Sequence, residues 1–254
     1  MITKEPKNWK DLQNKVNLIL NDIGLDSKTE FKLNTPTSKI EVDVYAIDPK
    51  SVDKIKYIIE CKNWNKNIPQ HVIHSFITTM NATGGDIGYI ISKKGFQKGA
   101  IESVNYTNIR LFSYNEFQEH YLMLWYKKSF AKRIYEISSD LISYTEPINS
   151  RRFKCQEKLT NIKAEKFDHL LDKYSDFATM LICIGSNSFE RRFSKEKNTF
   201  FSVEEIKVIV FDSLKIRLKS ENFQDLLIEL KGIIEDSVSE FNIIFGKNIF
   251  TNQN

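Results

Sequence analysis

Residues 39–62 read KIEVDVYAIDPKSVDKIKYIIECK, and this stretch decides the fold. Apolar and polar side chains alternate over its first part, which predicts a β-strand across residues 39–48. The predicted faces of that strand are Ile40, Val42 and Val44 on one side, and Glu41, Asp43 and Tyr45 on the other. One face of this strand therefore presents a carboxylate.

A further strand is predicted across residues 54–61, after a turn that begins at Asp48-Pro49. Its middle, Tyr57-Ile58-Ile59, is continuously apolar, as is typical of a central strand buried on both faces. Side chains two apart on a strand point the same way. Glu60 and Lys62 should therefore leave one face of the sheet together.

The flanking sequence supplies the remaining elements of an α/β domain. Helical periodicity, strand patterns and turn residues predict the following order: a helix at 7–24, a strand at 29–34, the two strands above, a helix at 68–82, a strand at 86–92, a short helix at 95–104 and a strand at 109–112. This αβββαβαβ order predicts a mixed sheet with helices on both faces.

Strand signals fade after about residue 115, and the rest of the chain is expected to be mainly helical. One or two helices are predicted over 115–145, and others over 156–180, 202–219 and 222–243. We therefore expect a first domain at 1–118 and a helical C-terminal domain at 119–254. Target recognition, dimerisation and regulation are all open roles for the second domain.

Bulk composition is that of a globular protein with a slight basic excess. The 254 residues include 37 Lys and Arg against 33 Asp and Glu, a formal net charge of +4. This is a weak lean toward nucleic acid. No apolar run approaches the roughly 20 residues of a membrane span, and the polar start is not a secretory signal. The three cysteines form no CxxC pair, so we expect a protein of the reducing cytoplasm. The lack of a long apolar run leads us to expect no membrane partner.

Asp43, Glu60 and Lys62 are the candidate reacting groups. If their strands pair, two carboxylates and one ammonium converge, and a divalent cation would balance the excess negative charge. Mg²⁺ bound to carboxylates and waters can generate hydroxide and neutralise a phosphodiester. Asp43, Glu60 and the Cys61 carbonyl would bind the metal, and Lys62 would position or deprotonate the water. The alternative is an ordinary Glu–Lys pair on a solvated strand face, since Glu-x-Lys alone is common.

Several phrases, in this order, resemble the Mrr-like restriction endonuclease family of the PD-(D/E)xK superfamily: EVDVYA, YIIECKNW, HVIHSF, GYIISKKGFQKGAIESV and NIRLFSYNEF. With the first helix included, the resemblance covers residues 7 to about 118. It implies a restriction-endonuclease-like α/β core that cleaves DNA with Mg²⁺, or with Mn²⁺ in its place, in a restriction or defence setting. By the same resemblance, Asp43, Glu60 and Lys62 match the catalytic positions of the family.

The sequence departs from that pattern at two positions. Val42 replaces the proline that gives the superfamily its name, and Gln13 lies where related enzymes often carry a metal-site glutamate. Glutamine can orient water but binds Mg²⁺ less well than glutamate, so Gln13 is an auxiliary site residue. This leaves two alternatives open: a weak or inactive DNA-binding or assembly module on the same fold, and a nuclease for structured DNA or RNA.

Residues close to the predicted site are candidates for nucleic-acid contact. Trp64 and Lys66 follow the catalytic strand, and Lys93 and Lys94 follow the next one. A packed tryptophan turn and solubilising lysines are the competing interpretation. The nearby pair of histidines, His71 and His74, has too few companions for zinc and is expected to be a partly buried surface pair.

Basic residues also gather in the second half. Residues 124–166 hold ten Lys and Arg against five Asp and Glu, interleaved with aromatic residues. This predicts either a nucleic-acid face or a solvated helix face; the candidates are Lys127, Lys128, Phe130, Lys132, Arg133, Tyr135, Arg151, Arg152, Phe153 and Lys154. A smaller cluster at 191–197 has the same two interpretations. A homodimer, or a protein partner bound through the C-terminal half, is a further open alternative.

Overall fold

A computed structural model of the chain describes residues 1–36, 38–185 and 200–250. The chain divides into two compact units, Met1–Lys128 and Ser129–Asn254. The basic cluster predicted at 191–197 lies outside the described residues. Within the described part of the chain, no helix combines the length and the apolar character needed to cross a bilayer.

The first unit is built on one five-stranded mixed sheet, as predicted. Its strands, in spatial order, are β1 (Asp26–Asn34), β2 (Lys39–Ile47), β3 (Lys56–Lys62), β4 (Ile87–Ser92) and β5 (Ile109–Ser113). β1, β2 and β3 are antiparallel, whereas β3, β4 and β5 are parallel. β3 is therefore central and is the strand at which the sheet changes from antiparallel to parallel.

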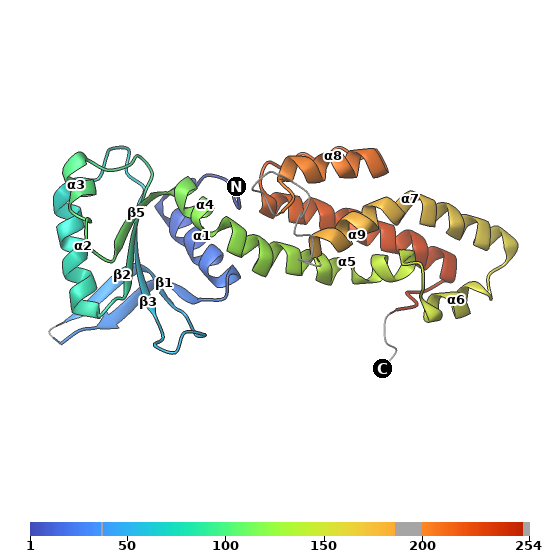
Figure 1. The fold of residues 1–254 in the computed structure, drawn as a ribbon, viewed down its shortest axis with the longest axis horizontal. Coiled ribbons are helices and arrows are strands. Elements are labelled where there is room, and N and C mark those ends of the chain that lie inside the picture. Colours follow the sequence, from blue (N-terminus) through green and yellow to red (C-terminus); the bar gives the residue numbers. More distant parts are fainter. Residues whose placement is uncertain (37, 186–199, 251–254) are drawn as a thin grey trace. The chain divides into compact units, whose positions relative to one another are not determined.

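Helices cover both faces of this sheet, which confirms the predicted fold class (Figure 1). They are α1 (Trp9–Asp22), α2 (Gln70–Thr83), α3 (Lys98–Glu102) and α4 (Tyr114–Trp125). α2 buries Ile73, Phe76 and Met80 in one core cluster with Ile58 and Ile90 of the sheet. α1 packs against the first three strands, and α4 packs against β4 and β5.

The predicted alternation along β2 is wrong at its centre. Val42 and Tyr45, three residues apart and expected on opposite faces, both belong to the core cluster that packs against α2. On β1, Glu30 falls opposite Asp43 in the register and has a positive φ of 52°. The alternation is thus interrupted around Asp43, although the register between β1 and β2 is the same on both sides of that residue.

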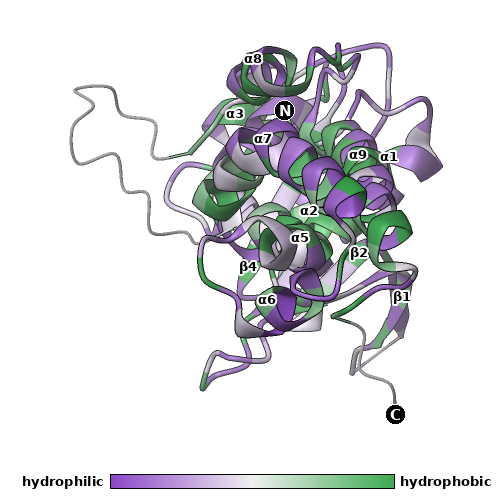
Figure 2. Ribbon diagram, turned by 90° about the vertical axis from the view of Figure 1, so that its right-hand side faces the viewer, coloured by the Kyte–Doolittle hydropathy of each residue, from purple (hydrophilic) through white to green (hydrophobic). Residues whose placement is uncertain are grey.

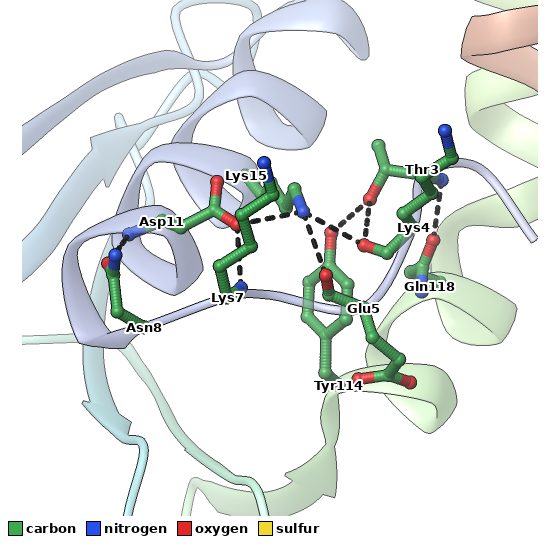
Figure 3. Close-up of polar contacts among 9 residues, drawn as sticks. All are labelled: Thr3, Lys4, Glu5, Lys7, Asn8, Asp11, Lys15, Tyr114 and Gln118. Atoms are coloured by element: carbon green, nitrogen blue, oxygen red, sulfur yellow. Dashed lines mark hydrogen bonds and ion pairs between the residues drawn. The ribbon is translucent and has the colours of Figure 1, made fainter.

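The N-terminal residues hold α1 against α4 (Figure 3). The Thr3 N–H donates to Gln118 Oε1 at 2.8 Å, and the Thr3 hydroxyl lies 2.6 Å from the Tyr114 hydroxyl. From α1, the Lys15 ammonium donates to two carbonyl oxygens of the same N-terminal segment, each at 3.1 Å. These bonds fix the helix that carries Gln13.

The described part of the second unit is mainly helical, as predicted. Its α-helices are α5 (Ala131–Thr145), α6 (Ser150–Gln156), α7 (Asn161–Gly185), α8 (Val203–Leu214) and α9 (Phe223–Phe245), and a π-helical turn, η1 (Tyr126–Phe130), precedes α5. Its helices are two-sided in hydropathy, with apolar and polar faces (Figure 2). Tyr144 stacks on Phe241 with ring centroids 4.7 Å apart, and Phe167 meets Phe241 edge-on. Aromatic packing thus forms the core of this unit.

The prediction of a nucleic-acid face in the second half of the chain is wrong for two of its residues, Arg152 and Phe130. Arg152 is only 4% exposed, and its guanidinium donates to the carbonyl oxygens of Tyr144 and Pro147 at 2.8 and 3.3 Å. Phe130 is fully buried. Arg152 therefore serves the carbonyl groups at the end of α5, where a cation is favoured, and neither side chain is available to nucleic acid.

The tight fit of α2 on β4 predicts that Gly88→Ala destabilises the first unit. A β-carbon at Gly88 would lie 2.8 Å from Phe76 Cε1 and 3.0 Å from both Ile109 Cγ1 and Met80 Sδ. Such overpacking typically lowers the free energy of unfolding by about 1–3 kcal/mol. Denaturant titration followed by tryptophan fluorescence measures it, because all three tryptophans lie in the first unit.

Gly232→Ala is the matched control, since none of the described residues comes within 4 Å of a β-carbon placed there on α9. Alanine is the better helix former, so this variant should leave the tryptophan-reported transition unchanged. Equal stability of Gly88→Ala and wild type would contradict the packing described here.

Candidate active site

Asp43 lies where β2 and β3 separate. Their ladder ends at the pair Val44 and Ile59, and the same register continued by one pair puts Asp43 opposite Glu60. Beyond that point, Asp43 Oδ2 accepts the Cys61 backbone N–H at 2.7 Å. A side-chain carboxylate therefore takes the place of a strand carbonyl, and this bond fixes Asp43 at the edge of the opening.

Gln13 of α1 holds the other oxygen of the same carboxylate. Its Nε2 donates to Asp43 Oδ1 at 2.8 Å, and the side chain is only 3% exposed. Its Oε1 is buried and has no hydrogen-bond partner among the described residues. The auxiliary residue predicted from the first helix thus contacts Asp43 directly and leaves one buried acceptor unsatisfied beside it.

Glu60 and Lys62 form an ion pair on one side of β3, where both line the same pocket. Their side chains are 25% and 21% exposed. Burial raises the pKa of the Glu60 carboxyl, and the negative charge of Asp43 raises it further, while the Lys62 ammonium acts in the opposite direction. The region around the two carboxylates therefore favours an added proton or cation.

A pocket of about 220 Å³ opens between β3 and α2 beside this pair. Besides Glu60 and Lys62, its lining consists of Trp64, His71, Val72, Ser75, Phe76 and Thr79. The floor is apolar at Val72 and Phe76, whereas the rest of the lining is aromatic, polar or charged. Both predicted catalytic side chains of β3 thus face one solvent-open depression.

The residues fit a hydrated divalent cation better than a metal held by protein alone. The described residues contain no group of three or more His, Cys, Asp or Glu side chains that could hold a metal. Two carboxylates, a carbonyl such as that of Cys61, and waters form a ligand set suited to Mg²⁺. The unsatisfied Gln13 Oε1 and the raised pKa of Glu60 both mark a need for hydrogen-bond donors or positive charge at this place.

Two loops beside the site are tied to each other. Ile68 and Phe96 form an isolated parallel bridge. The Lys93 backbone N–H donates to the Lys62 carbonyl at 3.1 Å, and the Lys93 ammonium donates to Asn65 Oδ1 at 3.0 Å. These contacts bring the loop that follows β3 against the loop that follows β4, so both loops have a fixed place beside the site.

The four residues predicted to contact nucleic acid lie in these loops. The ammonium groups of Lys62 and Lys66 lie 5.5 and 5.7 Å from the centroid of the Trp64 ring. Lys66, Lys93 and Lys94 are exposed. Lysine side chains are thus grouped around an exposed tryptophan at the edge of the pocket.

The two histidines of α2 differ in environment and do not behave as a pair. Both are exposed, contrary to the expectation of partial burial. His71 lines the pocket, whereas His74 Nε2 lies 3.4 Å from Gln70 Nε2. The pocket-lining role of His71 and Ser75 was missed from the sequence. Their spacing of four residues on an amphipathic helix, next to Val72 and Phe76, is the pattern that could have indicated it.

Comparison with known proteins identifies the first unit. Residues 7–121, a little under half of the chain, match the family model Mrr_cat, described as "Restriction endonuclease". This match confirms the predicted resemblance to the Mrr-like restriction endonuclease family for this segment of the chain. No curated protein matches the sequence. The crystal structure of a protein of unknown function, AF1548, covers 90% of this chain and 100% of its own at 15% identity and a TM-score of 0.37, which is too low to support an argument.

Asp43→Ala is predicted to destabilise the first unit more than Asp43→Asn. Alanine leaves the Cys61 N–H without its acceptor, and an unsatisfied buried donor costs about 1–3 kcal/mol. Asparagine retains an oxygen for Cys61, and its amide can donate to Gln13 Oε1 once the Gln13 amide rotates. Denaturant titration of both variants measures the difference; equal destabilisation would contradict the assigned bonds.

The raised pKa of Glu60 predicts that, without divalent metal, stability falls as pH rises. The folded protein holds the Glu60 proton more tightly than the unfolded chain does. Stability is therefore lost as pH rises from the ordinary glutamate pKa through the raised folded value. Unfolding titrations across this range, in chelator, should show a shallower loss for Glu60→Gln than for wild type. The same slope in both proteins would refute the assignment.

Proposed function

We propose that the first unit, whose residues 7–121 carry the restriction endonuclease domain, hydrolyses phosphodiester bonds of DNA with the help of Mg²⁺, or of Mn²⁺ in its place. One observation carries the proposal: the Asp43 carboxylate, fixed by the Cys61 N–H, lies close enough to Glu60 to raise its pKa, and Glu60 and Lys62 line an open pocket. Two carboxylates and an ammonium at a solvent-open edge match the needs of phosphodiester cleavage.

Asp43 and Glu60 would bind the cation, with the Cys61 carbonyl as a third ligand. Both oxygens of Asp43 already accept a hydrogen bond, yet each retains a second lone pair for a metal or its water. The cation supplies charge neutralisation and a water of lowered pKa. Gln13 keeps the Asp43 carboxylate in one orientation through its Nε2, and its Oε1 remains a buried acceptor beside that carboxylate.

Lys62 would act on the phosphate and its attacking water. In the free protein its ammonium is held by Glu60 and lines the pocket. The Lys62 ammonium would donate to the oxygens of the scissile phosphate. This favours an orienting and charge-stabilising role over that of a base in the free enzyme.

The DNA backbone would lie along the edge formed by the two tied loops. Ligands of open α/β sheets bind at the carboxyl ends of parallel strands, where β3 and β4 end here. Trp64, Lys66, Lys93 and Lys94 would contact the DNA there, with the lysines at its phosphates. We place the functional boundary near residue 118, with target recognition, dimerisation or regulation assigned to the helical half. A restriction or defence role follows from the family resemblance.

Purified protein should nick or cut plasmid DNA when Mg²⁺ is present. Lys62→Ala, Asp43→Asn and Glu60→Gln should each lower the rate by roughly 100-fold or more, since each removes a group that stabilises the transition state. Initial rates of plasmid conversion on agarose gels give the measurement. Lys50→Ala is the matched control, because Lys50 is an exposed lysine of the β2–β3 turn, outside the site.

A thermal shift in Mg²⁺ provides a readout independent of cleavage. The cation should raise the melting temperature of wild type and Lys50→Ala, and should do so less for Asp43→Asn and Glu60→Gln. Cutting that survives both Lys62→Ala and Asp43→Asn would eliminate this site. DNA binding without any cutting would instead favour the inactive DNA-binding module on the same fold.

A further inference from the structure

The pocket between β3 and α2 is lined by apolar and aromatic residues as well as by polar and charged ones. Metal binding alone does not account for the apolar and aromatic part of the lining. Its floor contains Val72 and the buried Phe76, and Trp64 stands at its edge with 37% of its surface exposed. A phosphate group needs only cations and donors around it. Apolar side chains beside an exposed indole are instead expected in a site that binds a flat, partly apolar ligand.

The α2 part of the pocket lining also presents polar groups. His71 and Ser75 lie four residues apart, one turn of helix, and Thr79 continues the row. For the side chains of His71 and Ser75, no hydrogen bond to a protein partner is found among the described residues. The Thr79 hydroxyl, in contrast, donates to the Ser75 carbonyl at 3.3 Å. The imidazole and hydroxyl are therefore free to bond the edge of a ligand.

Size restricts that ligand to one ring system. The pocket holds about 220 Å³, below the roughly 300–1,000 Å³ of sites that enclose a drug-sized molecule. It is about seven times the roughly 30 Å³ that one water occupies in the liquid. A single planar heterocycle fits this space, whereas a base pair does not.

Positive charge lies where the ligand would carry its phosphate. The ammonium groups of Lys62 and Lys66 lie over the Trp64 indole, 5.5 and 5.7 Å from its ring centroid, so a base that stacks there displaces an ammonium toward its own phosphate. An aromatic surface with cations beside it is the arrangement by which proteins bind unpaired nucleotides, because bases stack while lysines meet the backbone. Since Lys62 and Glu60 also line the pocket, the phosphate next to that base would lie at the reacting groups.

We propose that this pocket receives the base of one unstacked nucleotide beside the scissile phosphate. The first unit then prefers DNA with an unpaired nucleotide at the cut over fully paired duplex. This inference rests on the proposed nuclease function and specifies its substrate. Trp64 stacks on the base, and His71 and Ser75 bond its edge, so a base held in a continuous helix cannot make these contacts without leaving its stack.

Cleavage of two matched oligonucleotides tests the preference. One is a perfect duplex, and the other has the same sequence with a single unpaired nucleotide. Wild type in Mg²⁺ should cut the second roughly 5- to 140-fold faster, the range that one base–aromatic stack contributes. Ser75→Phe fills the pocket and should bring the ratio of the two rates close to one. Thr78→Phe, an exposed neighbour on α2 outside the pocket lining, should preserve the ratio.

Binding without cleavage separates this inference from the proposed function. Wild-type full-length chain in chelator is mixed with the same DNA carrying a fluorescent adenine analogue as the unpaired base. Stacking on Trp64 should quench the analogue, and Trp64→Leu or Ser75→Phe should abolish the quenching while Thr78→Phe retains it. Cutting that ignores the unpaired nucleotide, together with unchanged fluorescence, overturns the pocket assignment but leaves the nuclease. Quenching of this pattern without any cutting supports the pocket and refutes the nuclease.

Discussion

The hydrogen bond from the Cys61 N–H to the Asp43 carboxylate is the contact on which the rest of the site depends. It closes the end of the β2–β3 ladder with a side chain, and it therefore lets the two strands part without leaving a strand donor unsatisfied. On β3, the neighbouring Glu60 and Lys62 side chains line the pocket against α2. Gln13 completes the arrangement from α1, so a helix, a hairpin strand and the central strand meet at one carboxylate.

The arrangement carries an electrostatic cost that falls mainly on Glu60. Like charges opposite each other on neighbouring strands are unfavourable, and Glu60 is also partly withdrawn from water. Lys62 offsets only part of this, as the raised pKa of Glu60 indicates. Such local conflict inside an otherwise consistent fold is what functional sites commonly show. A bound cation would offset this repulsion and desolvation. The site is therefore expected to be less stable without a cation than with one.

Sequence reasoning found the elements whose signal is periodic and local. The apolar run before Glu60 indicated a central strand, and β3 is central. It did not predict features that depend on contacts between residues far apart in the sequence. The face change at Asp43 depends on the partner strand, where Glu30 has a positive φ. The short helix α6 was missed because seven residues carry too little periodicity. Arg152 looked like a surface cation, since nothing local shows that its donors serve the end of α5.

The mixed pairing of β3 sets where this chain can change length. A shift of one residue along β3 would turn Glu60 and Lys62 toward α1 and put Cys61 in the pocket. Parallel pairing with β4, over six residue pairs, resists that slip independently of β2. The turn between β2 and β3 is therefore not needed to fix the register of β3. Val52, at the tip of this turn, is 94% exposed. Insertions in this turn should be tolerated among relatives. A single deletion inside β3 would instead exchange the side chains on the two faces of that strand.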